Sequence, residues 1–307
     1  MYQHLWVLVD GTEASVAAVG QAVELARCLK ARITFVHARV EDADDEAAVD
    51  RAGEYLAKAE AAARASGVPC GVLLTSVQAM RDVIAAARER GRDLLFVGVR
   101  DDASDPDRSL LNEALAQLRV ARLLSPSAVP AGAERTIGII RHEHRSLANV
   151  VHVAAHTMRQ ARAHGATPDL GLLHAVVRYI QRYSIGWHHP REECALFHRL
   201  RERTSVLDAE LGELERQPER EGELMRELAG LLEPNADGVQ SAALESALER
   251  YTAFTWAHLG REEGVILPAA LRLLTSEDWA GIEAALAAAE PPRLDGHGDD
   301  RRLLALL

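Results

Sequence analysis

His258-Leu-Gly-Arg-Glu262-Glu263 repeats the spacing of an earlier run, His188-His-Pro-Arg-Glu192-Glu193. In each run a histidine stands four residues before a glutamate. One helical turn takes about 3.6 residues, so the two side chains share one face of a helix. Imidazole nitrogen together with carboxylate oxygen is a usual ligand set for iron and similar transition metals. A single pair is common on helix surfaces, but two copies on separate helical segments predict a metal site inside a helical domain.

The sequence around these two runs is helical, and strand patterns end at residue 136. Apolar periodicity predicts four long helices and a short fifth one. Their expected ranges are 137–163, 169–187 continuing to about 203 past a break, 205–232, 240–272 and 276–289. Short loops make neighbouring helices run up and down, and facing helices of such a bundle can carry histidine and glutamate into the core. We therefore expect an up-down four-helix bundle.

Helical phase indicates which polar side chains point inward. His144 lies on the apolar stripe of the first long helix, and His258 and Glu262 lie on that of the last. A buried carboxylate without a partner is costly, so an inward Glu262 implies a cation or a proton. Three histidines of the first helix fall on the polar side and are expected in solvent: His142, His152 and His156.

The pairing within the earlier run stays open, because His188/Glu192 and His189/Glu193 have the same spacing. Pro190 disfavours helical geometry at His189 and lacks a backbone donor. The pair His188/Glu192 superimposes on His258/Glu262 and is preferred. The other histidine is then expected outside the set of metal ligands.

Several stretches of the second half resemble the hemerythrin-like, HHE cation-binding family. They are Glu143-His144-Arg145, His188 to Glu192 with Leu196-Phe197, His258 to Pro268, and Asp278-Trp279. The resemblance covers residues 136–290. It implies a non-haem iron centre, with two ions bridged by carboxylates, that binds oxygen or reacts with oxygen or peroxide. Carried over by position, the metal ligands are His144, His188, Glu192, His258 and Glu262.

The third helix departs from this family, which has a further histidine where this chain has Pro218. An interior proline costs a helix about 3 kcal/mol, so the helix should kink or restart there. Glu219 is a candidate oxygen ligand in its place, while Glu221 and Glu223 are expected at the surface. Three outcomes remain: one metal ion, an asymmetric pair, or none. Manganese or zinc would accept the same atoms as iron.

The first half alternates strands with helices. Strands are expected at 4–9, 32–39, 70–75, 93–99 and 119–124, and helices at 13–30, 44–66, 77–90 and 108–118. This alternation implies right-handed crossovers and a parallel sheet covered on both faces. The fold class is therefore α/β plus all-α, with a five-stranded parallel α/β sandwich followed by the four-helix bundle.

Residues 1–126 resemble the universal stress protein family. The resemblance rests on Asp10 to Ser15 after the first strand, on Phe35-Val36-His37, and on Asp93 to Gly98. Many members bind ATP through a glycine-rich loop after the fourth strand. Here Gly98 is followed by Val-Arg-Asp-Asp-Ala-Ser-Asp-Pro-Asp, without further glycines that would let the backbone approach a phosphate. The aspartates would also repel a triphosphate. ATP is therefore not expected, and a scaffold or dimerising domain is preferred.

Composition limits the remaining partners. The 307 residues carry a net charge of −11, which gives no basic surface for nucleic acid or an anionic membrane. Three unpatterned cysteines fit a reduced cytoplasm, and no signal peptide is recognised. We expect domains at 1–126 and 136–290, a linker at 127–135 and a tail at 291–307.

The combined hypothesis is a cytoplasmic two-domain stress or redox protein, expected as a homodimer. Its iron centre would sense or bind oxygen, peroxide, another small diatomic ligand, or iron itself. One alternative is an iron-dependent peroxidase or oxidase, although no catalytic residue can be named. The other is a metal-free bundle that binds proteins.

Overall fold

The computed structural model describes residues 2–39, 46–76, 93–97, 122–124, 131–233, 241–292 and 298–307, with the single positions 79 and 82. Two compact units make up the chain. The first comprises Met1–Ala128 with Trp256–Ala269, and the second comprises Val129–Thr255 with Ala270–Leu307. The helices expected at 77–90 and 108–118 lie outside the described residues, apart from the two single positions.

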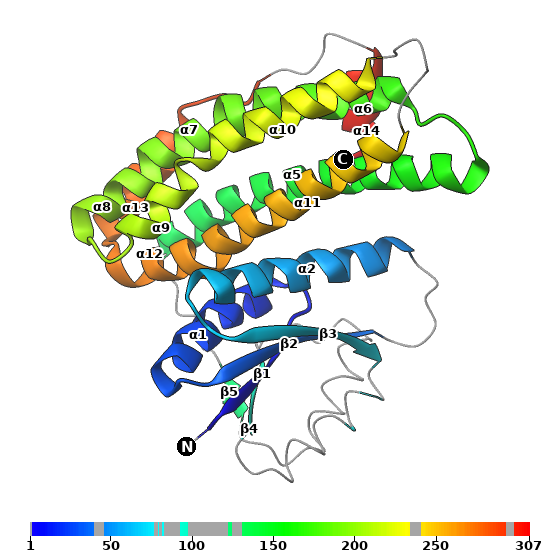
Figure 1. Cartoon of the computed structure of the whole chain (residues 1–307). Helices are drawn as coiled ribbons and strands as arrows, with labels where there is room; N and C mark the ends of the chain where they lie inside the picture. The colour runs from blue at the N-terminus through cyan, green and yellow to red at the C-terminus, as the bar shows by residue number, and fades with distance from the viewer. Residues whose placement is uncertain are drawn as a thin grey trace. The chain divides into compact units, whose positions relative to one another are not determined.

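Strands and helices alternate in the first unit. Its elements are β1 (His4–Leu8), α1 (Glu13–Leu29), β2 (Arg32–Arg39), α2 (Glu46–Ala65), β3 (Cys70–Ser76), β4 (Asp93–Val97) and β5 (Arg122–Leu124). The strand order is β3-β2-β1-β4-β5, and every neighbouring pair is parallel. Helices α1 and α2 lie against the same face of this sheet (Figure 1). The parallel α/β architecture expected from the sequence is confirmed.

The core of the first unit combines large side chains on the strands with small ones on the helices. The buried residues include Leu5, Val7, Ile33 and Phe35 on β1 and β2, and Ala18, Ala22, Ala59 and Ala62 on α1 and α2. Alanine faces let α1 and α2 approach the sheet closely, while the branched and aromatic strand residues fill the space between.

Asp10 organises the turn between β1 and α1. Its Oδ1 accepts hydrogen bonds from the Thr12 backbone N–H at 3.0 Å and from the Thr12 hydroxyl at 2.7 Å. The Thr12 side chain in turn accepts from the Ser15 N–H and caps α1. These contacts give Asp10 a local role in the turn that joins β1 to α1.

The segment Trp256–Ala269 of the first unit packs closely against α2. A Cβ placed on Gly264 would lie 2.3 Å from the Ala62 Cβ, and one on Gly260 would lie 2.3 Å from the Lys58 carbonyl oxygen. The Lys58 ammonium group lies 2.8 Å from Glu54 and 3.5 Å from Glu263. Both glycines are therefore needed for the approach of two backbones, and a largely buried ion-pair network accompanies this contact.

Among the described residues, every element after residue 130 is helical. They are α5 (Ala131–His164), α6 (Leu170–Tyr179), η1 (Ile180–His188), α7 (His189–Glu192), η2 (Glu193–Phe197), α8 (His198–Arg203), α9 (Asp208–Leu214), α10 (Gln217–Leu232), α11 (Ser241–Arg261), η3 (Glu262–Ile266), α12 (Leu267–Leu273), α13 (Ser276–Ala287) and α14 (Gly298–Leu306). The helical character expected for the second half is confirmed (Figure 1). No helix in the described part of the chain is both long enough and apolar enough to cross a membrane.

Helix α5 begins inside the stretch expected to be a linker. Residues 127–130 lie outside the described residues, but α5 starts at Ala131 and takes in the remainder, Ala131 to Arg135. Alanine, glutamate and arginine favour helix, and no proline follows Pro130 until Pro168.

Pro190 and Pro218 affect their helices differently. Pro190 was expected to break its helix, yet α6 to α8 follow one another without a gap. The flanking elements η1 and η2 are π-helical, and the His189 N–H bonds back to the Ser184 carbonyl, five residues earlier. Wider turns of this kind accommodate a residue that lacks an N–H. At Pro218 the expected restart is confirmed, since α9 ends at Leu214 and α10 begins at Gln217.

Candidate metal centre

Helix α5 brings two polar side chains into the interior. His144 is fully buried and Glu143 is 5% exposed. They are neighbours of Ile140, Leu147 and Val151, the buried apolar stripe of this amphipathic helix. The inward orientation expected for His144 is confirmed. The histidines expected in solvent are less buried, since His142 and His156 are exposed and His152 is half-buried.

The π-helical stretch around Pro190 buries two consecutive histidines. His188, His189 and Glu192 are all buried, whereas Glu193 is exposed. The Nε2 of His188 lies 3.5 Å from Oε2 of Glu192, the residue four positions later. Burial thus favours His188/Glu192 over His189/Glu193 as the inward pair, although both imidazoles are turned inside.

The last long helix contributes the second pair where α11 passes into η3. His258 is 4% exposed and Glu262 is 1% exposed. Their facing atoms, Nε2 and Oε1, are 3.4 Å apart. The two pairs thus share the arrangement that their common spacing predicts, with an imidazole nitrogen directed to the carboxylate one turn later.

Four of the five expected ligands offer atoms to one point. One atom each from His144, His188, Glu192 and Glu262 can be chosen so that all lie within 4.8 Å of one another. Two bonds of about 2.2 Å to one ion span at most about 4.4 Å, so these side chains need to close by only a few tenths of an ångström. Two buried imidazoles with two buried carboxylates fit a divalent transition metal in donor type and in charge. His258 is not among these four, although it adjoins Glu262.

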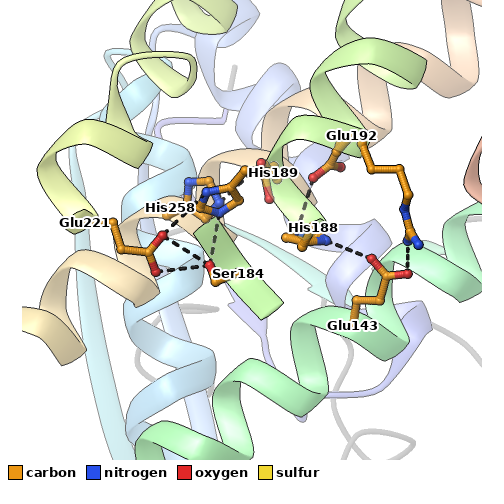
Figure 2. Close-up of polar contacts among 9 residues, drawn as sticks. Glu143, Ser184, His188, His189, Glu192, Glu221 and His258 are labelled. Carbon is orange, nitrogen blue, oxygen red and sulfur yellow. Dashed lines mark hydrogen bonds and ion pairs between the residues drawn. The ribbon is translucent and has the colours of Figure 1, made fainter. Parts of the chain in front are cut away.

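A carboxylate holds the His188 ring in place. The Nδ1 of His188 donates a hydrogen bond of 2.7 Å to Oε2 of Glu143 (Figure 2). Arg191 donates to the other oxygen of Glu143, and its guanidinium group stacks 3.5 Å from the centre of the Trp187 ring. This chain of contacts fixes the ring plane of His188 and leaves Nε2 as the nitrogen that could bind a metal ion.

The pKa of Glu143 shows the strength of this arrangement. Burial alone would raise that pKa. The hydrogen bond and charge of His188, together with those of Arg191, outweigh burial and hold the pKa of Glu143 below its ordinary value. Glu143 is therefore a charged acceptor at neutral pH, as a carboxylate that orients a histidine ligand must be.

The position of Glu221 on α10 differs from the one expected from the sequence. Glu221 was expected at the surface, but it is only 2% exposed. The spacing of the buried residues Leu214, Met225 and Leu228 places position 221 on the same inward stripe, and this periodicity is the signal that could have found it. Glu219, the candidate substitute ligand, is exposed and therefore lies outside the interior. Glu223 is exposed, as expected.

Glu221 meets three buried side chains inside the helical unit. The Ser184 hydroxyl lies 3.0 and 3.1 Å from its two oxygens, and the Tyr251 hydroxyl donates to Oε1 at 2.9 Å. His189 Nδ1 lies 3.4 Å from Oε2 (Figure 2). Burial, and next the charge of Glu221, raise the pKa of Tyr251 well above its usual range, so this phenol keeps its proton.

Cys194 has no part in this interior. It stands two residues after Glu192 and is exposed. In the first unit, the stretch 98–107 that was expected not to bind ATP lies outside the described residues.

Comparison with known proteins divides the chain into two regions. Residues 135–270 match the hemerythrin HHE cation binding domain, and residues 1–118 match the universal stress protein family. None of the curated proteins matches this chain.

Two solved structures are similar to the first region. A protein from the universal stress protein family of Burkholderia pseudomallei is 24% identical, with a TM-score of 0.33, over 41% of this chain and 97% of that one. A universal stress protein in complex with cAMP is 23% identical, with a TM-score of 0.32, over 41% of this chain and 98% of that one. By its two family matches, the chain joins a region similar to the universal stress protein family to a region similar to the hemerythrin HHE cation binding domain.

Proposed function

We propose that this chain is a cytoplasmic two-domain stress or redox protein whose helical half, an up-down four-helix bundle, holds non-haem iron. His144, His188, Glu192 and Glu262 are the ligands, and His258 is the fifth. The observation that carries the proposal is the convergence of four buried donor atoms within 4.8 Å. Burying two imidazoles and two carboxylates together is costly unless a cation accompanies them.

A non-haem iron ion bound there would supply a redox-active centre able to bind or react with oxygen or peroxide. The protein residues supply the rest. Glu143 and Arg191 fix the orientation of His188, and the burial of all four ligands limits the access of water. Such a site favours a small ligand, either a diatomic molecule or peroxide, over an extended organic substrate.

The first unit is proposed to provide dimerisation or contact with a partner. Its aspartate-rich stretch after Gly98 argues against a triphosphate, so ATP has no role in the proposal. Sedimentation of the full chain measures its oligomeric state, and a homodimer is expected. Differential scanning fluorimetry with and without ATP measures nucleotide binding, and an unchanged melting temperature is expected.

The decisive experiment counts metal in the full chain. Protein purified without oxygen is loaded with Fe²⁺ and desalted, and the metal per chain is measured by mass spectrometry. We expect retained iron in the wild type, loss of iron in His144→Ala and Glu192→Ala, and no change in His156→Ala, an exposed control on the same helix as His144. A wild type that keeps no iron would overturn the proposal, as would ligand variants that keep as much as the control.

The sensing role is tested on the same sample. A visible spectrum that changes on exposure to air or to peroxide supports a centre that meets these molecules. A spectrum unchanged by both would restrict the site to iron storage or iron sensing. Manganese and zinc are compared by the rise in melting temperature each produces, because an ion bound only to the folded state stabilises it.

A further inference from the structure

Two sets of buried polar side chains in the helical half bear on metal binding, apart from His258, which adjoins Glu262. One is the metal set of His144, His188, Glu192 and Glu262. The other, which we term the Glu221 cluster, consists of Glu221, Ser184, His189 and Tyr251. All members of this cluster are buried, with exposed fractions of 2%, 1%, 7% and 2% in that order.

The Glu221 cluster is held together by its own hydrogen bonds. Ser184 Oγ lies 3.0 and 3.1 Å from the two Glu221 oxygens, and Tyr251 donates to Oε1 at 2.9 Å. His189 faces the same carboxylate through Nδ1 and faces Ser184 Oγ through Nε2, at 3.4 Å in each case. Ser184 of η1, His189 of α7 and Tyr251 of α11 surround the carboxylate of Glu221 on α10. Figure 2 shows Ser184 and His189 beside Glu221. A metal ion bound to Glu221 would have to compete with these donors for the lone pairs of the carboxylate.

The balance of charge is a second, independent argument against a second metal ion near Glu221. The two carboxylates of the metal set, Glu192 and Glu262, balance one divalent ion. Glu143 is paired with Arg191 and is engaged by His188. Of the carboxylates named here, only Glu221 would remain to balance a second divalent ion, and uncompensated buried charge is costly.

Gln217, one helical turn before Glu221, also argues against a second metal ion. Gln217 is 8% exposed and stands four residues earlier, so it shares the inward face. An amide is a much weaker ligand for a transition metal than an imidazole or a carboxylate. The inward face of α10 therefore offers one carboxylate that is already hydrogen-bonded and one amide.

From these contacts and charges we propose that the centre holds a single metal ion, and that the Glu221 cluster is a hydrogen-bonded wall beside it. Glu221 faces His189, whose ring centre lies 5.4 Å from that of His188. The inference rests on the proposed function, because it assumes that the metal set is occupied.

The test is metal stoichiometry in the full chain. Oxygen-free protein is titrated with Fe²⁺, and with Co²⁺ as a redox-stable probe, and bound metal per chain is measured after desalting. We expect one ion per chain in the wild type and in Glu221→Gln, which keeps the size of the side chain but removes its charge. Glu219→Gln, an exposed position on the same helix, is the matched control.

Three outcomes would overturn the inference. Two ions per chain in the wild type would show that the second set also binds metal, while leaving the proposed function intact. A fall in metal content on Glu221→Gln, in protein whose circular dichroism equals that of Glu219→Gln, would make Glu221 a ligand. A wild type that binds no metal would overturn the proposed function together with this inference. Tyr251→Phe is a second variant in case Glu221→Gln does not fold. It removes only the hydroxyl that donates to Glu221 and is expected to leave one ion per chain.

Discussion

His188 donates from Nδ1 to Oε2 of Glu143 across 2.7 Å, and both side chains are buried. The bond joins two helices that are far apart in sequence. It also decides the tautomer of the imidazole, because a ring that donates from Nδ1 presents its lone pair at Nε2. That nitrogen lies toward Glu192, another proposed ligand. Glu143 would therefore act on the proposed metal centre through His188.

Replacing Glu143 tests this relationship. In Glu143→Gln the charged acceptor is lost, so His188 is less well oriented and less basic. Removing such an outer carboxylate weakens metal binding by about 10–100-fold. Competition with a chromophoric chelator measures the change in affinity. Glu134→Gln, at an exposed position on the same helix, should leave the affinity unchanged. Equal affinities in the two variants would contradict the role given to Glu143.

Gly264 tests the close packing within the first unit. A Cβ there would lie 2.3 Å from that of Ala62, so Gly264→Ala forces two helix backbones apart. Overpacking of this kind costs about 1–3 kcal/mol. Chemical denaturation followed by circular dichroism measures the loss.

The matched control for Gly264 is Gly53 on α2, whose added Cβ would meet nothing within 4 Å. Gly53→Ala should stabilise the protein by about 0.5–1 kcal/mol, because alanine favours helix. If Gly264→Ala stabilised the chain as much as Gly53→Ala does, the contact between Gly264 and Ala62 would not exist in solution.

Asp278 gives a prediction about pH. Its carboxylate accepts two hydrogen bonds of 2.9 Å from Arg203 and also closes the capping box with Thr275 at the start of α13. The hydrogen bonds of Arg203, and then those of Thr275, lower the pKa of Asp278 far below its ordinary value. A depressed pKa contributes stability that is present above the unfolded value of about 3.9 and is lost as the pH falls toward the folded value.

Asp278→Asn should therefore destabilise the protein by about 1–2 kcal/mol near pH 7, from the cap and the exposed side of the ion pair. The difference from the wild type should shrink as the pH falls below about 4, where the wild-type carboxylate begins to lose its charge. Thermal melts between pH 2.5 and 7 measure both effects. A difference that stays constant over this range would mean that Asp278 contributes nothing through its charge.

How far the sequence predicts this molecule depends on the kind of signal. The alternation of short apolar runs with helical segments predicts the parallel sheet, and helical periodicity predicts the helical half. The range expected for β2 is the one observed. The helical phase that His144 shares with its apolar neighbours at positions 140, 147 and 151 predicts its inward position. The restart at Pro218 follows in the same way, because proline chemistry is local.

The remaining features depend on contacts between distant residues. The π-helical turns around Pro190 turn His188 and His189 inward together, which a regular helix of 3.6 residues per turn does not predict. Glu221 can be buried because Ser184 and Tyr251, on other helices, donate hydrogen bonds to it. A local sequence pattern does not reveal such distant partners. Likewise, Glu263 carries the same spacing signal as Glu193, yet it is buried beside Lys58.

The account depends on a single ion surrounded by His144, His188, Glu192 and Glu262, and an anomalous difference map at the iron edge tests it most directly. For crystals of iron-loaded full-length protein, the account predicts one strong peak within bonding distance of these four side chains. A map without a peak inside this set, from crystals whose dissolved protein contains iron, would contradict it.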